Sequence, residues 1–113
     1  MGTNGKGSTA AILEAILAAH GSTVGLYTSP HLIRVEERIR IAGRPIDRVD
    51  FTRHLKTLDA FPSLTFFEAV TAAAFLAFAE SNVDVAVLEA GMGGRWDATR
   101  VADSTVAGLT NVG

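Results

Sequence analysis

The sequence contains no cysteine, which excludes a disulfide framework and a metal site built on thiolates. It has no apolar run of the ~18 residues that suggest a membrane-spanning helix, and it opens without a basic-then-apolar signal segment. It also lacks an excess of either charge, since 10 Lys and Arg stand against 12 Asp and Glu, so nothing favours nucleic acid as a partner. These absences predict a soluble cytoplasmic protein with no nucleic-acid or membrane partner.

The composition that remains indicates a folded α/β unit. Apolar residues make up 48% of the chain and charged residues 19%, which provides a core and argues against disorder. Helical spacing alternates with short apolar runs typical of buried strands, an order that predicts a mostly parallel sheet flanked by helices, with one small hairpin inserted. The predicted elements are a helix over 7–20, a strand over 23–28, a hairpin over 38–46, helices over 48–61 and 65–81, and strands over 83–89 and 105–110.

A glycine-rich segment leads directly into the first helix, whose apolar face is marked by Ile12, Leu13, Ile16 and Leu17. Glycines let bare backbone N–H groups approach an anion, the helix N-terminus adds unpaired donors, and a lysine supplies a cation for the outer phosphates. The segment departs from the strict G-x-x-x-x-G-K-[ST] motif, because glycine stands where the hydroxyl belongs; an ordinary glycine-rich turn is the alternative. The predicted phosphate loop comprises Gly2, Thr3, Asn4, Gly5, Lys6, Gly7 and Ser8.

A second candidate feature is a carboxylate at the end of a strand. The apolar run 85–88 leads into Glu89, and glycines follow from Gly91. In open α/β sheets, ligands bind at the carboxyl ends of strands, and a carboxylate there suits Mg²⁺, which prefers oxygen ligands. A solvent-facing glutamate is the alternative. The nearby phosphate-binding segment favours the metal site.

Six motifs along the chain resemble those of one enzyme family. They are GTNGKGST, GLYTSPHL, ERIRI, LTFFE, VAVLEAGMGGRWDAT and TNVG, in this order over residues 2–113. In these motifs the chain resembles the folylpolyglutamate/dihydrofolate synthases, the folate branch of the Mur-ligase family of ATP-dependent amide-forming enzymes. The resemblance implies a P-loop NTPase-like domain of the Mur-ligase central-domain type. It also implies a reaction in which ATP phosphorylates a carboxylate and an amine then attacks the acyl phosphate. The acceptor would be the γ-carboxylate of a reduced folate, or dihydropteroate, and the amine would be L-glutamate.

The resemblance also assigns roles to residues. Residues 2–8 would bind ATP, with Lys6 and Glu89 as catalytic residues, and Ser29 and Glu89 would hold Mg²⁺. His31 and Arg38 would be candidates for contact with the pterin-side substrate. From residue types alone, the alternatives are a turn residue for Ser29, a loop histidine for His31 and the polar face of a hairpin for Arg38.

Other positions leave the resemblance incomplete. Trp96 and Arg100 stand where family members have Leu and Asn, so their roles stay open. The aromatics of LTFFE are more often core residues than a substrate wall, and Glu68 in the same motif is expected near the site.

The ends of the chain indicate part of a longer protein. Only Met1 precedes the phosphate loop, which needs a strand leading into it. The family's further metal-binding His, its modified Lys and its C-terminal domain would lie beyond Gly113. We therefore predict that residues 1–113 are part of a nucleotide-binding domain and do not turn over alone. Another Mur-type amino-acid ligase, and a nucleotide-binding module without ligase chemistry, remain alternatives.

Overall fold

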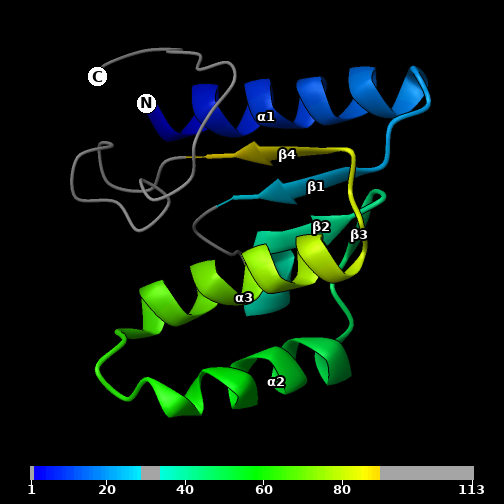
Figure 1. Cartoon of the computed structure of the whole chain (residues 1–113). Coiled ribbons are helices and arrows are strands. Elements are labelled where there is room, and N and C mark those ends of the chain that lie inside the picture. Colours follow the sequence, from blue (N-terminus) through cyan, green and yellow to red (C-terminus); the bar gives the residue numbers. More distant parts are fainter. Residues whose placement is uncertain (1, 29–33, 90–113) are drawn as a thin grey trace.

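The computed structural model describes residues 2–28 and 34–89, with side chains described from Thr9 onward, and confirms the predicted α/β class. Its described part is a four-stranded sheet with helices on both sides (Figure 1). The elements are α1 (Gly2–Ala19), β1 (Val24–Tyr27), the 3₁₀ helix η1 (Val35–Arg38), β2 (Ile39–Ile41), β3 (Arg44–Pro45), α2 (Arg48–Thr57), the 3₁₀ helix η2 (Leu58–Ala60), α3 (Phe66–Glu80) and β4 (Val85–Leu88).

The sheet is mixed, with strand order β3-β2-β1-β4. β1 and β4 are parallel, whereas β2 pairs antiparallel with both β1 and β3. The predicted hairpin is therefore present, but it continues the sheet instead of standing apart from it, because its backbone pairs with the free edge of β1. Every residue of β1 is buried, as predicted for a central strand. β4 differs, since Ala86 is exposed.

The two faces of the sheet carry different helices. An ideal Cβ on Gly25 would lie 2.6 Å from the Phe78 ring, so this face of β1 meets α3. Side chains alternate along a strand, so the buried Val24 and Leu26 point to the opposite face. Figure 1 shows α1 alongside β4 and β1, with α3 and α2 together on the other side.

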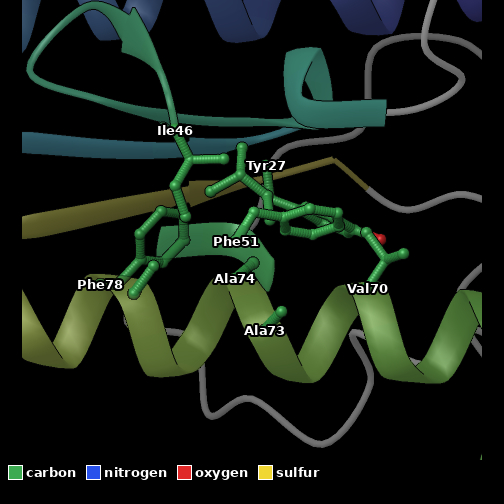
Figure 2. Close-up of a cluster of buried hydrophobic side chains, with 9 residues drawn as sticks. Tyr27, Ile46, Phe51, Val70, Ala73, Ala74 and Phe78 are labelled. Carbon is green, nitrogen blue, oxygen red and sulfur yellow. The ribbon is translucent and has the colours of Figure 1, made fainter. Parts of the chain in front are cut away.

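The main core lies between the sheet and α3. Figure 2 shows Tyr27, Ile46 and Phe51 gathered over α3, where Val70 and Phe78 meet them. α3 is rich in small residues on this face, which lets the helix lie close to the strands. The fully buried small residues are Ala73, Ala74 and Ala77.

Capping residues place the helix ends close to the predictions. The Thr65 hydroxyl accepts from the Glu68 N–H at 3.1 Å, and the Glu68 carboxylate accepts from the Thr65 N–H at 2.9 Å, which is a capping box. Asp47 accepts from the Val49 N–H at 3.0 Å and caps α2, as predicted. α2 ends at Thr57, and η2 completes the helical stretch that the sequence predicted up to residue 61.

Helix α1 begins earlier than predicted. Its backbone is helical from Gly2, so residues 2–8, predicted as a loop, belong to the helix. A helix pairs the peptide groups of this segment locally, whereas a loop would need partners elsewhere. The first turn carries no acidic residue. The unpaired N–H groups and the positive end of the helix dipole therefore lie at the amino end of this segment.

The rotation of α1 also differs from the prediction. Ile12, Leu13 and Ile16 are exposed, although their spacing predicted a buried face. Glu14 is buried instead, with its carboxylate 3.3 Å from Nε of Arg40 on β2. A buried charge needs a partner, and this ion pair lies on the side of α1 that faces the sheet.

The turn between β2 and β3 holds an alanine in left-handed backbone. Ala42 has φ 54° and Gly43 has φ 81°, as in a two-residue type I′ turn. Left-handed backbone costs an L-residue about 1–2 kcal/mol, and asparagine tolerates it better than alanine. Because the Ala42 side chain is exposed, Ala42→Asn is expected to raise the free energy of unfolding by about 0.5–1 kcal/mol in urea titrations. The β-branched variant Ala42→Val should lower it, and the reverse order would contradict the turn assignment.

Candidate functional site

Three elements meet at one end of the sheet. The parallel strands β1 and β4 end at Tyr27 and Leu88, which are partners in the register. α1 runs in the opposite direction, so its amino end lies at the same end of the sheet as these carboxyl ends (Figure 1). Carboxyl ends of parallel strands beside a helix N-terminus are where α/β sheets bind ligands, anions in particular.

Glu89 lies at this end of the sheet, directly after β4 as predicted. The residue is only 7% exposed, and its N–H donates to the Tyr27 carbonyl at 2.9 Å. Thr28 follows Tyr27 and donates its own N–H to the Arg38 carbonyl at 2.9 Å. Glu89 and Thr28 therefore come next to each other at the ends of two paired strands.

The residues at this end of the sheet fit a divalent cation that is held partly by the protein and partly by a bound phosphate compound. Across 2–28 and 34–89, no group of three or more His, Asp or Glu side chains is arranged to hold a metal alone. A single buried carboxylate nevertheless fits Mg²⁺, which proteins bind through one or two carboxylates together with phosphate oxygens and waters. Ser29 and His31, also predicted as site residues, lie in 29–33, outside the described residues. Trp96 and Arg100 lie outside them too, in 90–113.

Arg38 packs on an aromatic ring. Its guanidinium carbon lies 5.7 Å from the centroid of the Phe67 ring, within the range of a cation–π contact. Phe67 is half-buried in the first turn of α3, while Phe66 beside it is 63% exposed. Arg38 thus has a structural contact, and its contact with substrate stays a prediction. Glu68, expected near the site, completes the capping box of α3 with the N-cap residue Thr65.

Sequence reasoning did not single out a pair of buried hydroxyls, one of which belongs to Tyr27, the backbone partner of Glu89. The Tyr27 hydroxyl lies 2.8 Å from the Thr71 hydroxyl, and Thr71 donates to the Phe67 carbonyl at 2.9 Å. Because the Thr71 proton is used in that second bond, Tyr27 is the donor in the first. The signal in the sequence was a lone hydroxyl residue on the apolar face of α3, between Val70 and Ala74.

The 3₁₀ helix η1 also carries a buried carboxylate, that of Glu36. Glu36 accepts from Nε of Arg48 at 2.9 Å, and Nε of Arg34 lies 3.8 Å away. Backbone hydrogen bonding within η1, followed by the bond from Arg48, holds the pKa of the Glu36 carboxyl below its ordinary value of 4.5.

The lowered pKa of Glu36 is expected to make the free energy of unfolding depend on pH in the acid range. A pKa lowered by folding stabilises the protein above the unfolded value of 4.5, and this contribution is lost as the pH falls through the folded pKa. From neutral pH down past 4.5, the parent should lose more unfolding free energy than Glu36→Gln, which cannot titrate. Parallel pH profiles in urea titrations would contradict this expectation.

A hollow of about 660 Å³ lies elsewhere, on the outer face of α2. Two of its three cations are already neutralised, since Arg48 pairs with Glu36 and Arg53 pairs with Glu80 and Asp50. The hollow is open, and no buried carboxylate lines it. We therefore place the candidate site at the strand ends instead. None of the helices described is long and apolar enough to cross a membrane.

Similar proteins point to one family. A family model described as the Mur ligase middle domain matches residues 1–113. Dihydrofolate synthase/folylpolyglutamate synthases from Buchnera aphidicola (subspecies Schizaphis graminum) and Escherichia coli K12 are 45% and 43% identical to this chain, over 99% and 98% of it. The chain spans only 28% and 27% of these relatives. A crystal structure of the bifunctional folylpolyglutamate synthase/dihydrofolate synthase from Yersinia pestis, complexed with AMPPNP and Mn ion, superposes with a TM-score of 0.86 at 45% identity, covering 89% of this chain and 25% of that one.

Proposed function

Since the chain belongs to the Mur ligase middle domain family, we propose that it forms part of the nucleotide-binding domain of an ATP-dependent ligase. The ligase joins L-glutamate to the γ-carboxylate of a reduced folate, to dihydropteroate, or to both, in keeping with the names of its relatives. We place the reaction in the cytoplasm. The observation that carries the proposal is the meeting of the α1 amino end with the carboxyl ends of β1 and β4, beside the buried Glu89.

In this proposal, residues 2–8 bind the phosphates of ATP. The amino end of α1 presents unpaired N–H groups and a partial positive charge to an anion. Gly2 and Gly5 lie in the first turn of α1, where the backbone N–H groups have no partner within the helix and no Cβ shields them. Lys6 adds a full positive charge, which neutralises the outer phosphates as a point charge.

Glu89 is assigned to bind Mg²⁺ together with Ser29 and phosphate oxygens. The cation neutralises charge on the phosphates when it is bound. Burial of Glu89 and the hydrogen bond from its N–H to the Tyr27 carbonyl fix its backbone at the end of β4, which supports this assignment. His31 and Arg38 are assigned to the acceptor side; the Arg38 carbonyl accepts from Thr28, directly after β1.

The proposed reaction has two steps. An acceptor carboxylate oxygen attacks the γ-phosphorus, the bond to the bridging oxygen breaks, and ADP leaves with those electrons. The glutamate amine, after losing a proton, attacks the acyl carbon, and phosphate leaves as the amide forms. The protein positions the acceptor oxygen in line with the γ-phosphate and neutralises the charge that develops.

The test is an assay of the complete natural protein with ATP, Mg²⁺, labelled L-glutamate and either tetrahydrofolate or dihydropteroate. The proposal expects ADP to form only when acceptor and glutamate are both present, with one ADP per amide. Release of ADP without acceptor would identify a nucleotide-hydrolysing module. Glutamate transfer to a non-folate acceptor alone would identify a different ligase. Residues 1–113 by themselves are expected not to turn over.

A further inference from the structure

A closed circuit of contacts surrounds the end of β1. Glu89 N–H donates to the Tyr27 carbonyl, and Thr28 N–H donates to the Arg38 carbonyl. Arg38 lies over the ring of Phe67. The circuit closes through the two buried hydroxyls, because Tyr27 donates to Thr71 and Thr71 donates to the Phe67 carbonyl.

Tyr27 belongs to this circuit through both its backbone and its side chain. Its carbonyl holds the N–H of Glu89, and its hydroxyl reaches α3 on the face of the sheet. Tyr27 is fully buried, and Thr71 is 2% exposed. A shift of β1 relative to α3 would therefore stretch the hydroxyl pair and move the backbone partner of Glu89.

Stability alone does not account for two hydroxyls in this core. Replacing both partners of a buried hydrogen bond with apolar groups of the same shape is often nearly neutral. Phenylalanine and valine would fill the same space as Tyr27 and Thr71. A hydrogen bond differs from apolar packing in having a preferred distance and direction. This pair therefore defines the position of β1 relative to α3 more closely than apolar packing would.

We infer that Tyr27 and Thr71 are positioning residues that hold Glu89 in the geometry needed to bind a divalent cation. The inference rests on the metal role given to Glu89 in the proposed function, and it does not depend on which acceptor is used. Neither residue touches the cation. Their effect passes through the Tyr27 carbonyl to the backbone of Glu89.

The test compares four variants of the complete natural protein: Tyr27→Phe, Thr71→Val, the double variant, and Thr71→Ser, which keeps the hydroxyl. Two quantities are measured, namely stability in urea and affinity for Mn²⁺ by electron paramagnetic resonance, with a non-hydrolysable ATP analogue present. Thr57→Val is the matched control, because the Thr57 hydroxyl makes the same bond to the carbonyl four residues back, on α2. Glu89→Gln removes the proposed metal ligand and gives the Mn²⁺ affinity that remains without it.

Each single removal of a hydroxyl is expected to lower stability and to weaken Mn²⁺ binding by up to about tenfold. Tenfold is the low end for a partner bonded directly to a metal ligand, and this pair acts on Glu89 only through its backbone. The double variant should recover stability but not Mn²⁺ affinity. Thr71→Ser and Thr57→Val should bind Mn²⁺ like the parent.

A double variant with both stability and affinity restored would overturn the inference and show that the pair only fills the core. Equal Mn²⁺ binding by the parent and Glu89→Gln would also overturn it, together with the metal role of Glu89. Ligase function is judged separately by glutamate addition. A protein that adds no glutamate, but whose Mn²⁺ affinity follows the hydroxyl pair, would keep this inference and lose the proposed reaction.

Discussion

Replacing Glu89 with glutamine is expected to lower the rate of ATP-dependent glutamate addition by at least about 10-fold, since loss of a metal ligand should cost no less than loss of an outer-shell partner. Glutamine keeps the shape and the backbone N–H that bonds to Tyr27, but it removes the negative charge that a hard cation prefers. Because Glu89 is buried at the strand ends, a glutamine of nearly the same shape keeps the packing there while removing the charge.

The steady-state rate at saturating ATP, measured over a range of Mg²⁺ concentrations, checks this expectation. Glu80→Gln supplies the control, because it makes the same chemical change at the far end of α3, where Glu80 pairs with Arg53. That control should keep the parent rate. A Glu89→Gln protein with the parent rate and the parent Mg²⁺ dependence would remove Glu89 from the site.

Adding one methyl group at Gly25 is expected to lower the free energy of unfolding by about 1–3 kcal/mol, the usual cost of overpacking a core. The new Cβ of Gly25→Ala would lie 2.6 Å from Cδ1, 2.7 Å from Cε1 and 2.9 Å from Cγ of Phe78. Phe78 is itself buried, so its ring has little room to move. Valine at the same position should cost more than alanine.

Two further variants show whether this contact is the cause. Combining Gly25→Ala with Phe78→Leu removes the ring, so the pair should be less destabilising than the sum of the two single variants. Ala86→Val adds bulk to the strand partner of Gly25 at an exposed position and should leave stability nearly unchanged. Urea titrations measure all of these, and additive losses would contradict close packing of β1 on α3.

Local sequence signals predicted the elements whose limits are set locally. α3 begins and ends where predicted because Thr65 and Glu68 cap it within four residues of each other and Ser81 stands at its end. The strand leading to Glu89 was predicted for a similar reason, since an apolar run ends there at a charged residue. The placement of Glu89 at the carboxyl end of a strand is confirmed. Its role as a metal ligand stays a prediction.

Features that depend on partners distant in the sequence were not predictable in this way. The side of α1 that faces the sheet carries Glu14, whose partner Arg40 is 26 residues away, whereas the spacing of Ile12 and Ile16 favoured the opposite face. The hairpin joins the sheet because β2 pairs with the edge of β1. The local sequence of a strand does not determine which strand it pairs with. The Tyr27–Thr71 bond spans 44 residues for the same reason.

The most direct test of the central claim is a crystal structure of the complete natural protein with Mn²⁺ and a non-hydrolysable ATP analogue, in which anomalous scattering locates the metal. The account predicts a metal peak within coordinating distance of the Glu89 carboxylate and nucleotide phosphates at the amino end of α1. A nucleotide bound in the hollow on α2, or a metal peak with no contact to Glu89, would contradict it.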